Sequence, residues 1–156
     1  MKRQLVFIPV AADELGVLVG DPPIENRPAY TVTPELLAEL GYAEAESEDA
    51  EYAALILASV AGLAAHGVRL VVVAEVEPSL IEVSEDPANG EVLLLSCPTS
   101  SMTAWFAEEP GVDVTDAAAM AHGLTIDLAW DLPQVQDLLQ EHELLWNDVV
   151  EYRRGA

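Results

Sequence analysis

Short apolar runs, most of them bounded by glycine, proline or acidic residues, set the pattern of the chain. The run at 4–10 is rich in Val, Phe and Ile and alternates little, and the run at 68–76, rich in Val, gives the strongest strand signal in the chain. The first run predicts a central strand. It follows Lys2 and Arg3, but cleavage after Ala12 would leave a signal peptide shorter than the usual length. Further strands are expected at 28–33, 80–84, 91–97, 102–107 and 144–150.

Helix boundaries are marked most clearly at Thr33-Pro34-Glu35, where Thr can cap, Pro occupies the first helical position and Glu meets the positive end of the dipole. That helix should end at Gly41. The longest expected helix spans 48–65 and is almost entirely apolar from Tyr52 onward, so other elements should cover it on most sides. Other helices are expected at 13–19, from 113 or 115 to 123, and at 132–142, while 124–130 is ambiguous and 144–150 has a helical continuation as its alternative.

The spacing of these elements predicts the fold class. The strands between 68 and 107 follow one another closely, and Asn89-Gly90 favours a hairpin turn, so we expect an antiparallel meander. Helices before and after it would cover one face. The expectation is therefore an α+β fold with a largely antiparallel or mixed sheet, helices packed on one face, and a single domain over 1–156 with a frayed tail at 153–156.

Charge narrows the classes of partner. The chain of 156 residues has 28 acidic and 6 basic side chains, a net charge of −22. Nucleic acids and anionic membrane surfaces are bound largely through Lys and Arg, so neither is an expected partner. The apolar stretch at 52–65 is too short to span a membrane. The single cysteine, Cys97, allows no intramolecular disulfide and predicts a reducing compartment.

Complete catalytic motifs are absent from the sequence. Glu141-His142-Glu143 begins like the zinc-protease motif, but Trp146 stands where the second His is required. No nucleophile elbow or phosphate-binding loop occurs. His66 and His122 each precede a glycine at an expected helix end, where the helix dipole favours protonation. We therefore predict no catalytic residue, no cofactor and no specific metal site, although a carboxylate site for calcium or magnesium stays open.

The most unusual feature is an acidic run at 44–51, five acids in eight residues. Such a dense acidic surface attracts basic proteins. The leading hypothesis is thus a non-catalytic acidic domain that binds a basic protein partner. Its candidate binding residues are Glu44, Glu46, Glu48, Asp49 and Glu51.

Two alternatives stay open. The chain could be a small enzyme or ligand-binding protein for a neutral or cationic molecule, with a pocket between sheet and helices near Tyr30, Tyr52 and Trp146. The acidity could instead reflect adaptation to salt, which screens repulsion among surface charges. The pattern makes no prediction of oligomeric state.

Four stretches together carry a family resemblance: Val6-Phe7-Ile8-Pro9, residues 29–34 with the helix after them, residues 51–55, and Leu144-Leu145-Trp146. With them the chain resembles a family of small uncharacterised actinobacterial proteins. The resemblance implies a cytoplasmic bacterial protein and transfers no catalytic residue.

Overall fold

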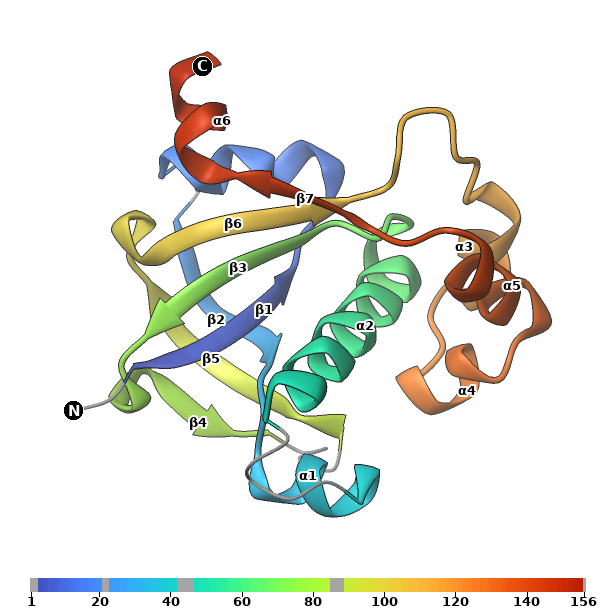
Figure 1. Cartoon of the computed structure of the whole chain (residues 1–156), viewed down its shortest axis with the longest axis horizontal. Coiled ribbons are helices and arrows are strands. Elements are labelled where there is room, and N and C mark those ends of the chain that lie inside the picture. The colour runs from blue at the N-terminus through green and yellow to red at the C-terminus, as the bar shows by residue number, and fades with distance from the viewer. Residues whose placement is uncertain (1–2, 21–22, 42–46, 85–88, 156) are drawn as a thin grey trace.

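Seven strands form one antiparallel sheet in the computed structural model, which describes residues 3–20, 23–41, 47–84 and 89–155 (Figure 1). In the order in which they lie side by side, the strands are β4 (Ile81–Val83), β5 (Glu91–Cys97), β2 (Ile24–Tyr30), β1 (Gln4–Pro9), β3 (Val71–Val76), β6 (Met102–Ala107) and β7 (Leu145–Asp148). The first strand is central, as predicted. The α+β class and the antiparallel sheet are both confirmed.

The order of the strands differs from the expected meander. β4 and β5 do pair as antiparallel neighbours, with Glu82 opposite Leu93, but β3 pairs with β1 and β6 instead of β4. The chain crosses from the middle of the sheet to its far edge between β3 and β4, and β1 and β2 fill the space between the two halves. The meander prediction was wrong because β1, the most buried strand of the first segment, pairs along its whole length with β3.

Helices lie on both sides of this sheet. Their bounds are η1 (Ala12–Val19), α1 (Pro34–Leu40), α2 (Ser47–His66), η3 (Pro78–Leu80), η5 (Thr99–Ser101), α3 (Thr115–Ala121), α4 (Ile126–Trp130), α5 (Pro133–Glu141) and α6 (Val149–Gly155). The ambiguous stretch at 124–130 thus contains a short helix. The last expected strand is β7, and the helical alternative for that region also occurs, as α6 directly after it. Among the described residues, no helix combines the length and apolar character needed to cross a membrane.

Alternation along β1 divides the apolar core between two faces. Phe7 packs with α2 side chains, including Ala54 and Ala58. Its neighbours Val6 and Ile8 face the other way, and their cluster includes residues of η1 and α6. The longer helices lie on the α2 side, as expected. The sequence pattern did not indicate that η1 and α6 cover the opposite face.

The central helix α2 lies between two layers. One side contacts the sheet, and the other packs Val60 and Leu63 against α3 and α5 through Ala117 and Val135. Figure 1 shows α3, α4 and α5 grouped on the side of α2 away from the sheet. Burial on both sides explains why the sequence of α2 is apolar almost all round, and it confirms that other elements cover the helix on most sides.

The residues that cap α1 and precede β5 have the roles that the sequence predicts. The Thr33 hydroxyl accepts a hydrogen bond from the Leu36 amide at 3.0 Å, and Gly41 ends α1 with φ +73°. Gly90, just before β5, has φ +78°, and a Cβ there would lie 2.5 Å from the Thr31 carbonyl oxygen. Only glycine fits that close approach without displacing the backbone.

A buried arginine connects three distant segments. Arg69, just before β3, is 2% exposed, and its guanidinium donates to both Glu108 carboxylate oxygens at 2.5 and 2.6 Å. It also donates to the His142 carbonyl oxygen at 2.9 Å. The ends of β6 and α5 are thereby held beside the start of β3 by charge-assisted hydrogen bonds.

A second ion pair joins η1 to β2. Arg27 donates to both carboxylate oxygens of Glu14 at 2.7 and 2.5 Å. Hydrogen bonding from Arg27, the largest influence, lowers the pKa of Glu14 to about 2 from its usual 4.5, and the amide of Ala11 adds to the shift.

The C-terminal segment corrects one expectation. Arg153, placed in a frayed tail from the sequence, lies in α6 and donates to the Leu18 carbonyl oxygen at 2.9 Å and the Thr99 carbonyl oxygen at 2.7 Å. Trp105 and Tyr152 also meet edge to face, with ring centroids 5.9 Å apart. These contacts anchor α6, because the arginine satisfies two carbonyl groups from other segments.

We predict that Arg69→Met lowers the free energy of unfolding by about 3–5 kcal/mol, because it leaves the Glu108 carboxylate largely buried without its partner. Urea unfolding followed by circular dichroism measures the loss. The double variant Arg69→Met/Glu108→Gln should recover part of it, and Arg27→Met, at a more exposed pair, should cost less. Equal losses for Arg69→Met and Arg27→Met would contradict the anchoring role.

The Glu14 pair predicts a specific response to acid. Since folding lowers this pKa from 4.5 to about 2, the pair's contribution is complete above pH 4.5 and is lost as the pH falls toward 2. The difference in melting temperature between the wild type and Glu14→Gln should therefore shrink across that interval. A difference that stays constant from pH 5 to about pH 2 would show that Glu14 gains nothing from ionisation.

Candidate binding surfaces

An open groove lies beside α2 on the α2 face of the sheet. We call it the aromatic groove; it has a volume of about 320 Å³ and is lined by Leu5, Phe7, Glu51, Tyr52, Leu55, Val73, Thr103, Ala104, Phe106 and Trp146. Strand register explains the lining, since Phe7 pairs with Val73, Val73 with Ala104, and Phe106 with Trp146. Side chains of paired residues lie on the same face of a sheet.

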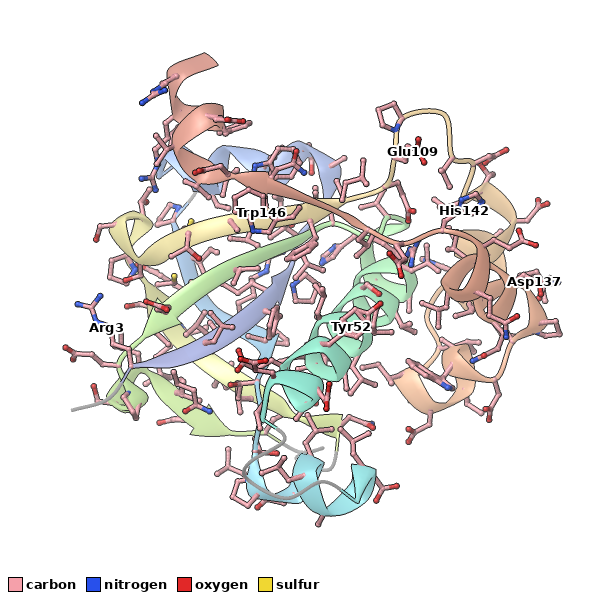
Figure 2. The ribbon with its side chains drawn as sticks, in the orientation of Figure 1. Arg3, Tyr52, Glu109, Asp137, His142 and Trp146 are labelled. Carbon is pink, nitrogen blue, oxygen red and sulfur yellow. The ribbon has the colours of Figure 1, made fainter. Side chains whose placement is uncertain are left out.

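Two exposed aromatic side chains flank this groove. Tyr52 on α2 is 53% exposed and Trp146 on β7 is 61% exposed; Figure 2 labels both. Among the described strands, β7 lies at the edge of the sheet with β6 as its one neighbour, so no described strand covers its outer side. Large aromatic groups left in water beside an apolar hollow are typical of recognition surfaces.

Acidic residues surround the aromatic groove. Glu51 lines it, and Glu48 and Asp49 lie exposed in the first turn of α2. By register, Glu75 lies opposite Leu5 and Asp148 opposite Ala104, which places both acids on the groove's face of the sheet. The groove is therefore apolar in its floor and negative at its margins.

The sequence-predicted acidic site is only partly described by the structure. Glu48, Asp49 and Glu51 fall in the first turns of α2. Glu44 and Glu46 lie outside the described residues. The sequence did not indicate that the described part of this run adjoins an aromatic groove, because the groove's other wall comes from β6 and β7.

The three aromatic residues of the alternative pocket do not share one site. Tyr52 and Trp146 line the aromatic groove together. Tyr30 is 4% exposed and lines a different cleft, on the other side of α2.

This second hollow, which we call the α2–β2 cleft, has a volume of about 430 Å³. It is lined by Pro9, Arg27, Pro28, Tyr30, Ala61, Ala64, Ala65, His66, Glu91, Gly123, Leu124, Thr125 and Ile126. The segment between α3 and α4 closes one side, where the Gly123 amide donates to the Ala64 carbonyl oxygen at 3.2 Å. The three alanines of α2 leave the space that larger side chains would fill.

Polar groups enter the α2–β2 cleft from three elements. Arg27 is on β2 and is held by Glu14, while Glu91 lies opposite Tyr30 in the register of β2 and β5. His66 is the last residue of α2. Burial lowers the pKa of His66 below its usual 6.5, with Arg27 as the second cause, so the ring is neutral at pH 7. This is opposite to the protonation that the helix dipole predicted from the sequence.

Other candidate chemistry is not assembled into a site. His142 contributes its backbone carbonyl to Arg69. Burial raises the pKa of the Cys97 thiol to about 11, which keeps it protonated and unreactive at neutral pH. In the described ranges, no three His, Cys, Asp or Glu side chains are grouped closely enough to hold a metal ion.

Sequence reasoning missed the α2–β2 cleft. Arg27 and Glu91 are 64 positions apart in the chain, and both line this cleft because β2 pairs with β5. The available signal was indirect: a helix with Ala at 61, 64 and 65 followed by His and Gly. Small side chains on one face of a helix indicate close packing or an unfilled space, and the pattern cannot separate the two.

The comparisons place the chain in a family. Comparison with curated proteins and with solved structures gives no match. A family model matches residues 4–154, from the start of β1 into α6, so the match spans every strand of the sheet. The chain belongs to a family of unknown function (DUF6912).

Proposed function

We propose that this protein is a non-catalytic acidic domain that binds a basic, extended segment of another protein in the aromatic groove. The observation that carries the proposal is the placement of two exposed aromatic side chains, Tyr52 and Trp146, in one groove with Glu51 and beside the acidic first turn of α2. The groove alone would not select a basic segment, and the acidic residues alone would not define a binding site.

Aromatic faces and carboxylates together favour arginine or lysine side chains. A guanidinium over the face of Trp or Tyr gains a cation–π attraction, and its N–H groups can pair with a carboxylate at the same time. The groove offers Trp146 and Tyr52 for the first contact and Glu51 for the second. Its apolar floor of Phe7, Val73 and Phe106 suits an apolar residue next to the basic one.

The size of the groove limits what it holds. A volume of about 320 Å³ accommodates one or two side chains, so the rest of the segment would lie along the acidic margin at Glu48 and Asp49. Because the whole chain has a net charge of −22, its field would speed the approach of a basic partner at low salt.

Replacing the acids of α2 tests the charge part of the proposal. The variant Glu48→Gln/Asp49→Asn/Glu51→Gln should weaken binding of a fluorescent decapeptide of alternating Arg and Leu by about tenfold, since each lost ion pair contributes a few tenths to 1 kcal/mol. Fluorescence anisotropy at low ionic strength measures the dissociation constant. A peptide of alternating Glu and Leu should not bind.

The matched control is Glu109→Gln/Asp137→Asn/Glu141→Gln, which removes the same charge from exposed acids. Figure 2 labels Glu109 and Asp137, which lie well away from Tyr52 and Trp146. This control should retain most of the affinity. If both triple variants lost affinity equally, binding would depend on the overall field alone and the assigned site would be wrong.

The aromatic part is tested separately. Trp146→Ala should weaken the Arg-Leu peptide by about fivefold, because one cation–π contact at a partly exposed site contributes about 1 kcal/mol. Leu128→Ala is the control, since Leu128 on α4 is similarly exposed, at 59%. Unchanged affinity for Trp146→Ala, with unfolding by urea as in the wild type, would remove the groove from the proposal.

A further inference from the structure

The edge strand β7 (Leu145–Asp148) presents different side chains on its two faces (Figure 1). Trp146 and Asp148 lie on the face of the aromatic groove, because their partners on β6 line that groove. Leu145 and Asn147 lie on the opposite face, where their partners pack against the other core cluster. One face of this edge thus carries an aromatic ring and a carboxylate, and the other carries an apolar and an amide side chain.

The backbone groups of β7 also alternate, between β6 and the outer edge. In antiparallel strands, the N–H and C=O of one residue point to the same neighbour, and those of the next residue point the other way. The Asn147 side-chain amide donates to the Trp105 carbonyl oxygen at 3.5 Å, so this carbonyl points toward β7. Trp105 pairs with Asn147, and Asn147 therefore directs its backbone groups to β6. Its neighbour Trp146 directs its own N–H and C=O to the outer edge.

A backbone hydrogen bond elsewhere in the sheet gives the same alternation. The Val10 amide donates to the Leu70 carbonyl oxygen at 3.0 Å, so Leu70 faces β1 and the next residue, Val71, faces β6. Val71 pairs with Phe106, which makes Phe106 face β3 and its neighbour Trp105 face β7. The register thus leads by a second route to the same orientation of β7.

The outer edge of β7 is open to a further strand. Strand edges are templates for pairing, and natural sheets often protect them with charged side chains or proline. At its centre β7 has neither, since Leu145 is 45% exposed and Trp146 is 61% exposed, on opposite faces. Within the described ranges, no strand lies beyond β7 and no loop backbone pairs with Trp146. A strand added here would remove apolar surface from water on both faces at once.

On the basis of the proposed function, we propose that the basic segment pairs with β7 as an added antiparallel strand in which basic and apolar residues alternate. A basic residue opposite Trp146 exchanges two backbone hydrogen bonds with it, and its side chain lies along the exposed indole at the margin of the aromatic groove. The next basic residue on that face lies opposite Asp148, where unlike charges attract. The apolar residue opposite Leu145 covers that side chain on the other face of the sheet.

The antiparallel direction follows from the orientation of Trp146. In an antiparallel pair, a residue directly opposite Trp146 turns its backbone groups toward β7, whereas in a parallel pair it would turn them away. The arginines of an alternating Arg-Leu peptide therefore direct their N–H groups to β7 when their side chains lie on the groove's face. Its leucines direct their N–H groups to solvent.

Peptides methylated at backbone nitrogens test this pairing. The fluorescent Arg-Leu decapeptide is compared with one methylated at the nitrogens of all its arginines and one methylated at the nitrogens of all its leucines. Arginine methylation should raise the dissociation constant at least about tenfold, because it removes donors and places methyl groups between the strands. Leucine methylation should leave the dissociation constant within about twofold of the parent peptide, since those nitrogens face solvent.

The face opposite the groove gives a second test. Leu145→Gln should weaken the parent peptide about threefold, because Leu145 contacts an added strand but points away from the aromatic groove. Val83→Gln is the matched control, since Val83 is 84% exposed on β4 at the other edge of the sheet, and it should bind the peptide as the wild type does. Urea unfolding verifies that both variants retain the fold.

Loss confined to the arginine-methylated peptide supports pairing with β7. Equal affinities of the two methylated peptides, or loss with leucine methylation instead, overturn it, and the proposed function still stands if Trp146→Ala weakens the parent peptide. Leu145→Gln binding as tightly as Val83→Gln overturns it as well. A parent peptide that does not bind overturns both proposals. If the chain alone sediments as a dimer that Leu145→Gln dissociates, the edge pairs with a second copy and the proposal is wrong.

Discussion

The scarcity of positive charge is the constraint on which this structure depends. Only six basic side chains accompany 28 acids, and three of the six, Arg27, Arg69 and Arg153, donate to internal acceptors from distant segments. Arg69 is the strongest case, because its buried guanidinium holds the ends of β6 and α5 beside β3. Salt screens repulsion between exposed acids that lie more than about 10 Å apart, whereas these short, partly buried contacts between segments are screened much less.

Because these arginines are engaged in internal contacts, they also affect which partners the surface can recognise. With three cations engaged inside, the outward field is dominated by carboxylates, and the margins of the aromatic groove show this at Glu48, Asp49 and Glu75. A surface of this kind discriminates by charge over distance and by aromatic contact at close range. The α2–β2 cleft differs because it contains an arginine, Arg27, whose charge Glu14 compensates directly.

Local chemistry was predictable from the sequence, and long-range pairing was not. The cap at Thr33, the end at Gly41 and the strand at 4–10 each depend on residues within one or two turns. The meander failed because strand order depends on which buried strand β1 pairs with, and several apolar runs offer similar partners. For the same reason, the sequence singled out Glu51 but not Phe106, which lines the same groove, and it did not indicate that Arg27 and Glu91 line one cleft.

The composition of α2 follows from the two hollows it separates. Its first turns carry Glu48, Asp49 and Tyr52 toward solvent and the aromatic groove, and its last turns carry Ala61, Ala64 and Ala65 to the α2–β2 cleft. Larger residues at those alanines would pack more surface and stabilise the helix interface, yet the helix leaves about 430 Å³ unfilled beside three polar groups. Because this cleft opens to solvent, water satisfies the polar groups that line it, so small side chains are tolerated there without the penalty that an enclosed void carries.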